Sequence, residues 1–298
     1  MEETSDPEEL SRGILEQQQV KQELAAIKAE RERLRLDTPV PPREEAPPPS
    51  NILPFPSRTL PSPGLCCGNA LLLDYLYGVE SDALQSLPEE RTRQLFDFAT
   101  TAQAARALRC RRRMLARILD ETCLDSGKGA RMLCVAGGHF REAELARELR
   151  HGHFGEMLVF DDDVERLDRV RKSYGALGVL TRLGNLEQLL SGECGFEGYD
   201  LVYSSGITEL LDDRRCERLV QRLFQALRPG GRLLLANFRP GVDAIAILER
   251  LLDWHPRYRH DVQMLSLLDG VDYNQIASAR VFHDIGQRIV FLEAVRYG

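Results

Sequence analysis

A chain of 298 residues with 43% hydrophobic and 29% charged residues has the composition of a globular protein of one or two domains. Its formal net charge of −7 argues against a general nucleic-acid binder, because phosphate contacts need a basic surface, and no apolar run approaches the ~20 residues of a membrane span. The seven cysteines are scattered and odd in number, and no apolar run follows the acidic N-terminus, so we expect a reduced, cytoplasmic protein without a secretory signal.

The first 63 residues have the sequence of a tail in front of the folded part. Residues 1–36 predict a marginal coiled coil, because apolar residues from Leu10 to Leu34 recur close to heptad positions while a glycine and polar residues interrupt the seam. Residues 37–63 hold ten of the fifteen prolines, which favours an extended linker. We expect a disordered tail, and its helix is either a solvated segment or a site for a protein partner or self-association.

A helical extension is predicted over residues 64–128, where it would form a lid on the domain that follows. The stretch "GNALLLDYLYG" (68–78) predicts a short helix, and residues 101–121 predict a longer one. In the longer helix, apolar residues share one face and six arginines crowd the rest. This arginine-rich face is either simply solvated or a binding surface for an anionic substrate.

From residue 129 to residue 298 the chain alternates apolar strands with amphipathic helices. Strands are predicted over residues 131–136, 156–161, 178–183, 199–205 and 231–238, and helices over 141–150, 164–174 and 215–227. The alternation predicts an α/β fold with a doubly wound, Rossmann-like parallel sheet covered on both faces. The last strands, within residues 278–295, are joined by a tight turn and predict a C-terminal antiparallel hairpin, which an ordinary nicotinamide-binding domain lacks.

The stretch "LCVAGGHF" (133–140) has the pattern of a ligand-binding turn, and we call residues 136–140 the glycine loop. The first strand ends at Ala136, and Gly137 and Gly138 allow the backbone to turn sharply and to approach a ligand without an intervening Cβ. Phe140 stands where a third glycine is usual. The sequence leaves open whether this is a working cofactor loop, a variant of one, or a remnant.

Two further strand ends complete a predicted adenosine pocket. Asp161 ends the second strand 23 residues after Gly138, where a carboxylate can accept both ribose hydroxyls, and Asn185 follows the third strand, where an amide can pair with an adenine edge. Asp161 and Asp162 could instead belong to an acidic cluster that favours a helix N-terminus. The predicted cofactor-binding residues are Ala136, Gly137, Gly138, Asp161, Asp162, Asn185, Leu186 and Ser204.

Residues 130–298 resemble the class I S-adenosylmethionine-dependent methyltransferases. The resemblance rests on the "LCVAGG" loop, the acid of "VFDDD", "GYDLVYSSG" at the fourth strand and "LRPGGRLLLANF" leading into the fifth. The Pro-Gly-Gly before the fifth strand is the most specific of these motifs, and the terminal hairpin agrees with it. The resemblance implies S-adenosylmethionine as the cofactor and methyl transfer as the reaction.

A narrower similarity is to bacterial methyltransferases that make 3-hydroxy fatty acid methyl esters as extracellular quorum signals. It rests on "AGGHFRE", "YSSGITELLDD", "ANF" and "DWHPRYR". In that group the first loop runs roughly Ala-Cys-Gly-Pro-x-Arg-Glu; Arg141 and Glu142 match it, whereas Gly137 and His139 depart. The group also lacks the third glycine, so Phe140 is compatible with a working site. The similarity implies a small-molecule acceptor, with the carboxylate of a (3-hydroxy) fatty acid as the candidate.

Methyl transfer from a sulfonium is an in-line displacement, in which the protein mainly positions the nucleophile and excludes water. A carboxylate acceptor is already ionised and needs no base, whereas a hydroxyl acceptor needs one; His139 is the best candidate for that base, or else a simple loop residue. Arg259 either holds a carboxylate by two hydrogen bonds or caps a helix end, and Trp254 either walls an apolar pocket or packs in the core. The expected catalytic residues are His139, Tyr258 and Arg259, and the expected substrate-binding residues are Ser205, Asn237, Phe238 and Trp254.

Other classes of function fit the sequence less well. A non-catalytic methyltransferase-like module, acting through its N-terminal helix and linker, is the main alternative. A nicotinamide-dependent oxidoreductase is disfavoured, because the loop lacks Gly-x-Gly-x-x-Gly. No metal site is predicted, because His151 and His153 have no partner at metal-ligand spacing in the sequence.

Overall fold

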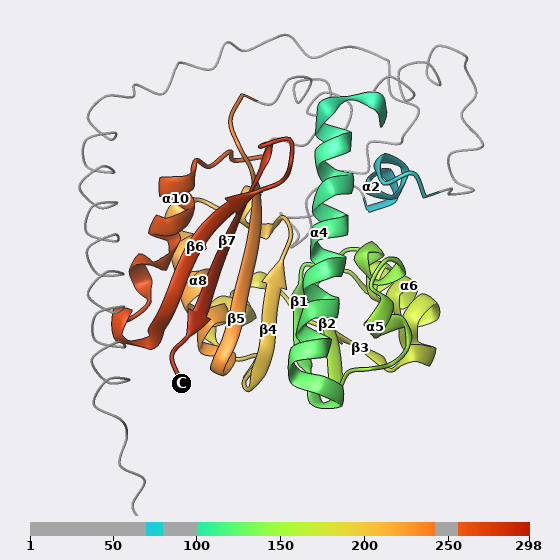
Figure 1. Ribbon diagram of the computed structural model, residues 1–298, viewed down its shortest axis with the longest axis horizontal. Helices are drawn as coiled ribbons and strands as arrows, with labels where there is room; N and C mark the ends of the chain where they lie inside the picture. The colour runs from blue at the N-terminus through green and yellow to red at the C-terminus, as the bar shows by residue number, and fades with distance from the viewer. Residues whose placement is uncertain (1–69, 80–99, 242–255) are drawn as a thin grey trace, which may run out of the picture.

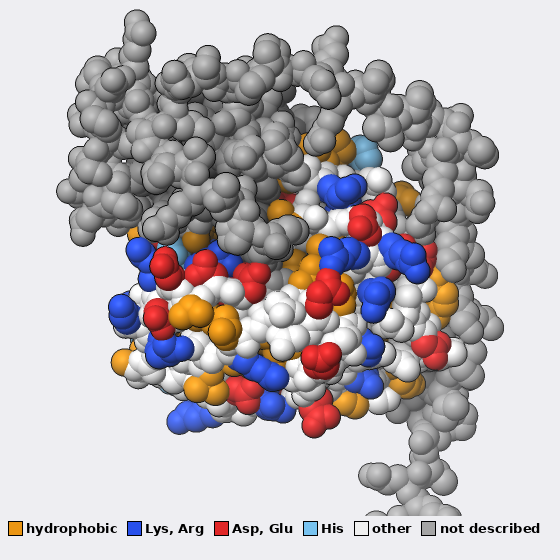
Figure 2. Space-filling model, turned by 180° about the vertical axis from the view of Figure 1, so that it is seen from behind, with side chains coloured by type: hydrophobic (Ala, Val, Ile, Leu, Met, Phe, Trp, Pro, Cys, Tyr) orange, Lys and Arg blue, Asp and Glu red, His pale blue; other side chains and the backbone are white. Residues whose placement is uncertain are grey.

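The computed structural model describes residues 70–79, 100–241 and 256–298 (Figure 1). The predicted tail (1–63) and Trp254 lie outside these residues and stay predictions. Of the helices described, none is both long and apolar enough to cross a membrane. On the face shown in Figure 2, acidic and basic side chains are interspersed over the coloured part of the surface.

Seven strands form one sheet in the order β3-β2-β1-β4-β5-β7-β6 (Figure 1). The strands are β1 (Arg131–Val135), β2 (Glu156–Asp161), β3 (Val179–Leu183), β4 (Tyr199–Ser204), β5 (Leu227–Phe238), β6 (Ile276–His283) and β7 (Ile289–Arg296). The first five run parallel, and β7 is antiparallel to both β5 and β6. The predicted doubly wound sheet and its terminal hairpin are therefore confirmed. Because β1 lies between β2 and β4, the strand order reverses at the carboxyl ends of β1 and β4, which is where such folds bind ligands.

Helices cover both faces of the sheet. The α-helices are α2 (Ala70–Leu76), α4 (Gln103–Ser126), α5 (Arg147–Arg150), α6 (Val164–Tyr174), α7 (Leu186–Ser191), α8 (Asp213–Gln225) and α10 (Asp261–Ser266). Short 3-10 turns are η2 (Gly127–Gly129), η3 (Arg141–Glu144), η4 (Gly175–Leu177), η5 (Ile207–Glu209), η6 (Leu267–Gly270) and η7 (Tyr273–Gln275). One apolar core joins the sheet to α2, α4, α5 and α6, and a second joins it to α7, α8 and α10. Apolar strand residues therefore meet a helix layer on either side, as parallel sheets require.

The arginine-rich face of α4 serves partly as a structural surface. Arg109 donates from Nη1 to the Leu76 carbonyl at 2.7 Å and from Nη2 to the Thr100 carbonyl at 3.0 Å. Arg112 is buried, and its Nε donates to the carbonyl of Arg141 at 2.9 Å. These two arginines fasten α2 and the segment after the glycine loop to α4, so this part of the face is neither solvated nor open to an anionic substrate.

The helix predicted over 141–150 is interrupted. Residues 141–144 form the 3-10 turn η3, and α5 begins only at Arg147 after Ala146 adopts an extended conformation (φ −75°, ψ 111°). The carboxylate of Asp120 accepts hydrogen bonds from the backbone of Arg147 at 3.0 Å and of Glu148 at 2.7 Å. The Asp120 side chain of α4, distant in the sequence, thus accepts hydrogen bonds from the N–H groups at the start of α5. The apolar periodicity of residues 141–150 does not reveal this contact.

The strand predicted at 231–238 begins earlier, at Leu227. The register of β5 shifts against β4, and Gly230 has φ +76° in the irregular stretch. A Cβ on Gly231 would lie 2.5 Å from the Tyr199 carbonyl oxygen. The Pro-Gly-Gly motif therefore lets the start of β5 run close to β4 instead of ending in a separate turn.

Candidate functional site

The glycine loop leaves β1 at the switch point and coils back on itself. Three alternate residues have positive φ: Ala136 (+57°), Gly138 (+55°) and Phe140 (+54°). The N–H of Ala136 donates to the Phe160 carbonyl at 2.9 Å, and the N–H of Phe140 donates to the Gly137 carbonyl at 2.9 Å. Positive φ costs a non-glycine residue free energy, so surrounding contacts must hold Ala136 and Phe140 in place.

Gly137 is required by packing. An added Cβ would lie 2.9 Å from Cys134 Sγ and 2.9 Å from Val159 Cγ1. Both contacts are with side chains in the interior of β1 and β2. The loop therefore lies directly on the two strands, and only glycine permits that approach.

Phe140, in place of the third glycine, is an anchor in the core. Its side chain is fully buried, and its ring stands edge-on to the Tyr174 ring of α6 at a centroid distance of 5.7 Å. Edge-to-face pairs of this kind contribute about 0.5–1.5 kcal/mol beyond the area they bury. The aromatic side chain thus points away from the outer face of the loop and holds the loop from beneath.

Asp161 joins the ends of β1 and β2. Its Oδ2 accepts from the N–H of Gly138 at 3.1 Å, and its Oδ1 accepts from the N–H of Asp163 at 3.1 Å and from Arg166 Nε at 2.8 Å. Burial raises the pKa of Asp161 above its ordinary value, although Arg166 and the backbone donors oppose the change. Arg166 also pairs with Asp162 at 2.7 Å, so both predicted cofactor-binding acids are held by one guanidinium.

Helix α2 lies across the outer side of the glycine loop. Asp74 is 1% exposed; its carboxylate is 2.8 Å from His139 Nδ1 and accepts from Arg141 Nε at 2.8 Å and Nη2 at 2.7 Å. Burial by itself raises the pKa of Asp74, but the hydrogen bonds from Arg141 and His139 outweigh it, and the pKa is lowered. The same contact raises the pKa of Arg141. Asp74 therefore ties the extension to the loop by buried charge pairs.

A pocket opens between α2 and the glycine loop. Its lining is Ala70, Leu73, Asp74 and Tyr77 from α2 and the residue after it, Arg111 from α4, residues 136–142, and Ser205 after β4. Beneath it, Tyr203 donates its hydroxyl to Glu142 at 2.7 Å, and Arg111 lies 3.6 Å from the Glu209 carboxylate. Burial raises the pKa of Glu142 and of Tyr203. Two arginines, two acids and a histidine thus surround a space beside the glycine backbone.

The structure brings together only part of the predicted cofactor site. Ala136, Gly137 and Gly138 line the pocket, and Asp161 contacts the loop directly. Asn185 is exposed and caps α7, where its Oδ1 accepts from the N–H of Gln188 at 2.9 Å. The remaining predicted residues are Asp162 beside Arg166, Leu186 at the start of α7, and Ser204, buried at the end of β4.

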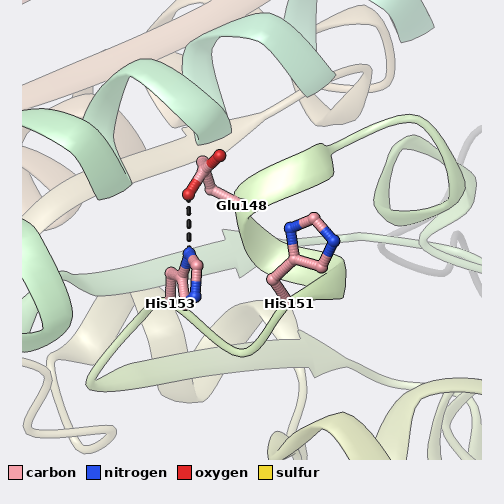
Figure 3. A group of neighbouring side chains, drawn as sticks. All are labelled: Glu148, His151 and His153. Atoms are coloured by element: carbon pink, nitrogen blue, oxygen red, sulfur yellow. Dashed lines mark hydrogen bonds and ion pairs between the residues drawn. The ribbon is translucent and has the colours of Figure 1, made fainter.

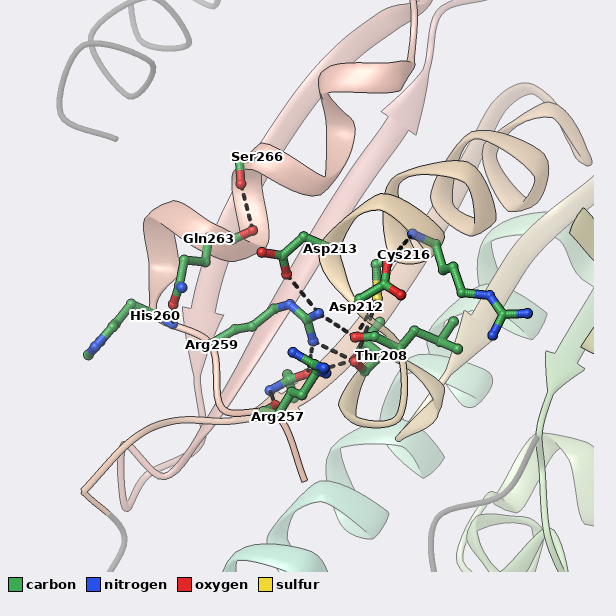
Figure 4. A network of polar contacts seen from close by, with 12 residues as sticks. Thr208, Asp212, Asp213, Cys216, Arg257, Arg259, His260, Gln263 and Ser266 are labelled. Atoms are coloured by element: carbon green, nitrogen blue, oxygen red, sulfur yellow. Dashed lines mark hydrogen bonds and ion pairs between the residues drawn. The ribbon is translucent and has the colours of Figure 1, made fainter. Parts of the chain in front are cut away.

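The predicted acceptor residues after β5 belong to an enclosed polar network (Figure 4). Arg259 is 1% exposed and donates to the carbonyls of Thr208 and Leu211, to Asn237 Oδ1 at 3.2 Å and to Asp213 at 3.0 Å. Asn237 is fully buried and accepts from the Thr208 hydroxyl at 2.8 Å. The geometry favours the structural alternative for Arg259, which fastens the chain before α10 to the loops after β4 and β5.

Two more predicted residues stand near that network. Phe238 is fully buried in the core, and its N–H donates to the Glu209 carboxylate at 3.0 Å. Tyr258 is half-buried and packs against the same core. Of the predicted substrate-binding and catalytic residues in the described part of the chain, only His139 and Ser205 line the pocket.

The pocket also contains residues that the sequence interpretation did not single out. Asp74 is the one acid in "ALLLDYL", and a lone charge in an apolar helix was a signal of a buried partner. Arg111 was hidden among six arginines of similar appearance. The role of Arg166 follows only from its position one helical turn after the acids of β2.

The expectation that His151 and His153 have no neighbouring ligand is wrong. Glu148, the second residue of α5, lies beside both, and His153 Nδ1 is 2.7 Å from Glu148 Oε2 (Figure 3). The metal-ligating atoms of the three side chains lie within 4.8 Å of one another. The turn after α5 brings the two histidines next to Glu148. The spacing of the three residues in the sequence does not predict this cluster.

Comparison with known proteins identifies the fold. No family model and no curated protein matches the chain. A possible exported protein from Bordetella parapertussis is 19% identical over 77% of this chain and 80% of its own, with a TM-score of 0.59. The carbon methyltransferase of CurJ is 13% identical over 76% and 66%, with a TM-score of 0.53, and an O-methyltransferase family protein from Burkholderia thailandensis is 16% identical over 77% and 70%, with a TM-score of 0.50.

At these identities the likeness concerns the fold. The chain has the fold of the class I S-adenosylmethionine-dependent methyltransferases, as its motifs predicted. The narrower similarity to the enzymes that form fatty acid methyl esters stays a prediction.

Proposed function

We propose that the chain is an S-adenosylmethionine-dependent methyltransferase that acts on a small molecule. The contact between the Asp161 carboxylate and the Gly138 N–H carries this proposal. It joins an acid at the end of β2 to a turn of glycine backbone that lines the pocket at the end of β1, the two groups that hold a nucleoside at a switch point. Residues 136–138 would lie against the cofactor, and Asp161 would accept its ribose hydroxyls.

Cofactor binding requires a change around Asp161, because this side chain is fully buried. A carboxylate offers about two acceptor positions on each oxygen. Oδ1 of Asp161 meets the Asp163 N–H and two nitrogens of Arg166, whereas Oδ2 accepts from the Gly138 N–H and has room for a ribose hydroxyl. Arg166 keeps the carboxylate oriented while the hydroxyl binds. We therefore expect the loop or α2 to shift on binding, with the Arg166 pair retained.

For the acceptor, we propose a carboxylate, with a (3-hydroxy) fatty acid as the candidate class. Arg111 and the half-buried Ser205 both line the pocket, and a guanidinium can hold a carboxylate by charge-assisted hydrogen bonds. An ionised carboxylate needs no base for methyl transfer. The reaction would then depend on positioning and on the exclusion of water.

One observation favours a hydroxyl acceptor instead. His139 lines the pocket, and its Nδ1 is held by Asp74, an arrangement that leaves Nε2 as a proton acceptor when Nδ1 carries the proton. His139→Gln separates the alternatives. A hydroxyl acceptor predicts a loss of about 10²–10⁴ in kcat. A carboxylate acceptor predicts a change of kcat within about twofold, because the base has no role in that reaction.

Calorimetric titration with S-adenosylmethionine and S-adenosylhomocysteine tests the cofactor. We expect one-to-one binding with micromolar Kd, and at least a tenfold loss in Asp161→Asn, which conserves volume. Asp168→Asn, which changes an acid of α6 that is paired with Arg171 at the surface, is the matched control, and thermal melts verify that each variant is folded. Equal affinity of Asp161→Asn and the control would contradict the proposed pocket.

A non-catalytic module with a methyltransferase fold is the second candidate. Two contacts favour it: Asp161 is enclosed, and Asp74 holds α2 across the glycine loop. The titration decides between the two, because a folded chain that binds neither cofactor form would identify the loop as a remnant. Partner binding through residues 1–63 and a cytoplasmic location stay predictions of the sequence.

A further inference from the structure

Glu148 of α5 forms a cluster with His151 and His153, which lie in the turn between α5 and β2 (Figure 3). Their ligand atoms lie within 4.8 Å of one another, and the two imidazole rings have a centroid distance of 5.6 Å. His151 and His153 are exposed, and the Glu148 side chain is 18% exposed. Two imidazoles and a carboxylate at the surface are the ligand set of an open zinc site.

The backbone that carries the three side chains is fixed. His151 donates from its N–H to the Arg147 carbonyl at 3.1 Å, His153 donates to the Glu148 carbonyl at 3.0 Å, and Gly152 supplies the positive φ of +68° that closes the turn. Leu149, in the middle of α5, is fully buried in the core. A turn anchored in this way loses little conformational freedom when an ion binds.

The base of the cluster is tied to α4 as well. Asp120 accepts hydrogen bonds from the backbone N–H groups of Arg147 and Glu148 at 3.0 and 2.7 Å. Glu148 Oε2 lies 2.7 Å from His153 Nδ1, so the carboxylate already faces one imidazole of the cluster. The Arg147 guanidinium lies 4.0 Å from Glu148 and opposes a cation, but its side chain is 80% exposed and can turn into solvent.

We propose that Glu148, His151 and His153 bind one divalent transition-metal ion of the Zn²⁺ class, with water at the remaining position. Ligands at about 2.0–2.1 Å from a tetrahedral Zn²⁺ stand about 3.3 Å apart, which small rotations of these side chains achieve. Nitrogen and carboxylate ligands favour Zn²⁺, Ni²⁺ and Co²⁺ over Mg²⁺. The ion would cross-link α5 to the turn that enters β2.

The site is separate from the proposed methyl-transfer pocket. The turn precedes β2, whereas Asp161 ends it, and five residue steps along a strand span about 17 Å. The ion would therefore stabilise the fold without contacting cofactor or acceptor. This proposal does not depend on the proposed function.

Calorimetric titration of the full chain with ZnCl₂ in a reducing, non-chelating buffer is the test. We expect one ion per chain with micromolar Kd, and a rise in Tm of about 5–10 °C at ~100 times Kd. His151→Gln and His153→Gln should each weaken binding at least tenfold. His283→Gln is the matched control, because His283 forms a histidine–carboxylate pair with Asp261 at 2.9 Å outside the cluster.

Co²⁺ spectra distinguish this cluster from zinc bound by the cysteines of the chain. Nitrogen and oxygen ligands give visible bands alone, whereas thiolate ligands add charge-transfer absorption in the near ultraviolet. We expect the unaltered chain and His283→Gln to show visible bands alone. In His151→Gln these bands should be lost. Absence of binding, a thiolate spectrum, or equal Zn²⁺ affinity in all variants would overturn it.

Discussion

Replacing Asp74 with asparagine should release α2 from the glycine loop. The change keeps the volume of the side chain but removes a negative charge that is 1% exposed and paired with Arg141 and His139. Removing one partner of a buried ion pair costs about 3–5 kcal/mol. Arg141 keeps its bond to Glu144 at 2.6 Å, and its side chain is 18% exposed, so we expect the lower value, about 3 kcal/mol.

This free energy should act on the local opening of α2, because the parallel sheet does not depend on Asp74. About 3 kcal/mol corresponds to a ~100-fold larger opening constant, since 1.36 kcal/mol is a factor of ten. The amides of Tyr77 and Val79 report the opening, because they donate to Leu73 and Asp74 carbonyls at 2.9 Å. Hydrogen exchange followed by mass spectrometry should show ~100-fold faster exchange over 70–79, with the β1 amides unchanged.

Two controls bear on this reasoning. Asp168→Asn removes an exposed ion pair with Arg171 on α6 and should change stability by less than about 0.5 kcal/mol. Acid should imitate the Asp74 variant, because a carboxyl whose folded pKa is lowered stabilises above its unfolded pKa of about 3.9 and loses that contribution as pH falls through the folded pKa. Unchanged exchange over 70–79 in Asp74→Asn would refute the assignment of α2 as a charge-anchored cover.

Three further predictions concern stability, measured by urea unfolding. Phe140→Ala should lose about 3–5 kcal/mol, because the fully buried ring also anchors the glycine loop, while Phe140→Leu should lose less. Arg259→Met should lower the urea midpoint without changing cofactor affinity, since the guanidinium donates to protein carbonyls; a loss of acceptor binding with unchanged stability would favour the carboxylate clamp instead. Gly231→Ala should lose about 1–3 kcal/mol, because the new Cβ would meet the Tyr199 carbonyl oxygen at 2.5 Å; the unfolding midpoint of Gly129→Ala, where a Cβ meets nothing within 4 Å, provides the comparison.

Strands β1, β2 and β4 were predictable because each is a short apolar run that is buried almost throughout, whereas the edge strand β3 buries only Val179. The predicted and observed bounds of β1 to β4 agree to within a residue or two, and the C-terminal hairpin is confirmed. The start of β5 was missed, because Pro-Gly-Gly usually indicates a turn. Here Gly231 lies within a strand, where the nearby Tyr199 carbonyl leaves no room for a Cβ. The break between η3 and α5 was missed because it depends on a contact with another helix. Asp120 of α4 accepts hydrogen bonds from the backbone N–H groups of Arg147 and Glu148.

The candidate site was predictable where it follows the backbone and not where it depends on side chains from distant segments. Gly137, Gly138 and Asp161 follow from strand ends, so their proximity comes from the topology. The Asp74 pair joins residues 65 positions apart, and no local pattern predicts that contact. Arg259 was predicted to bind a ligand because it is a charged residue in an aromatic segment. The sequence looks the same whether such a guanidinium faces a substrate or, as here, four protein acceptors.

The glycine loop explains why the extension belongs to the site. Its positive φ at Ala136 and Phe140 costs about 1–3 kcal/mol at each residue, a cost that a third glycine would avoid at position 140. Burial of the Phe140 ring offsets part of it from below, and the Asp161 contact with Gly138 offsets part from the side. The outer side is held by Asp74.

Contacts from three directions thus hold the positive φ at position 140, which a glycine would adopt without strain. Removing α2 would leave the parallel sheet intact but would take away the charge that fixes His139 and Arg141 at the mouth of the pocket. Docking of α2 therefore supplies the outer of the three sets of contacts that hold the loop. The conformation of the glycine loop is therefore coupled to the position of α2, because Asp74 contacts His139 within the loop and Arg141 directly after it.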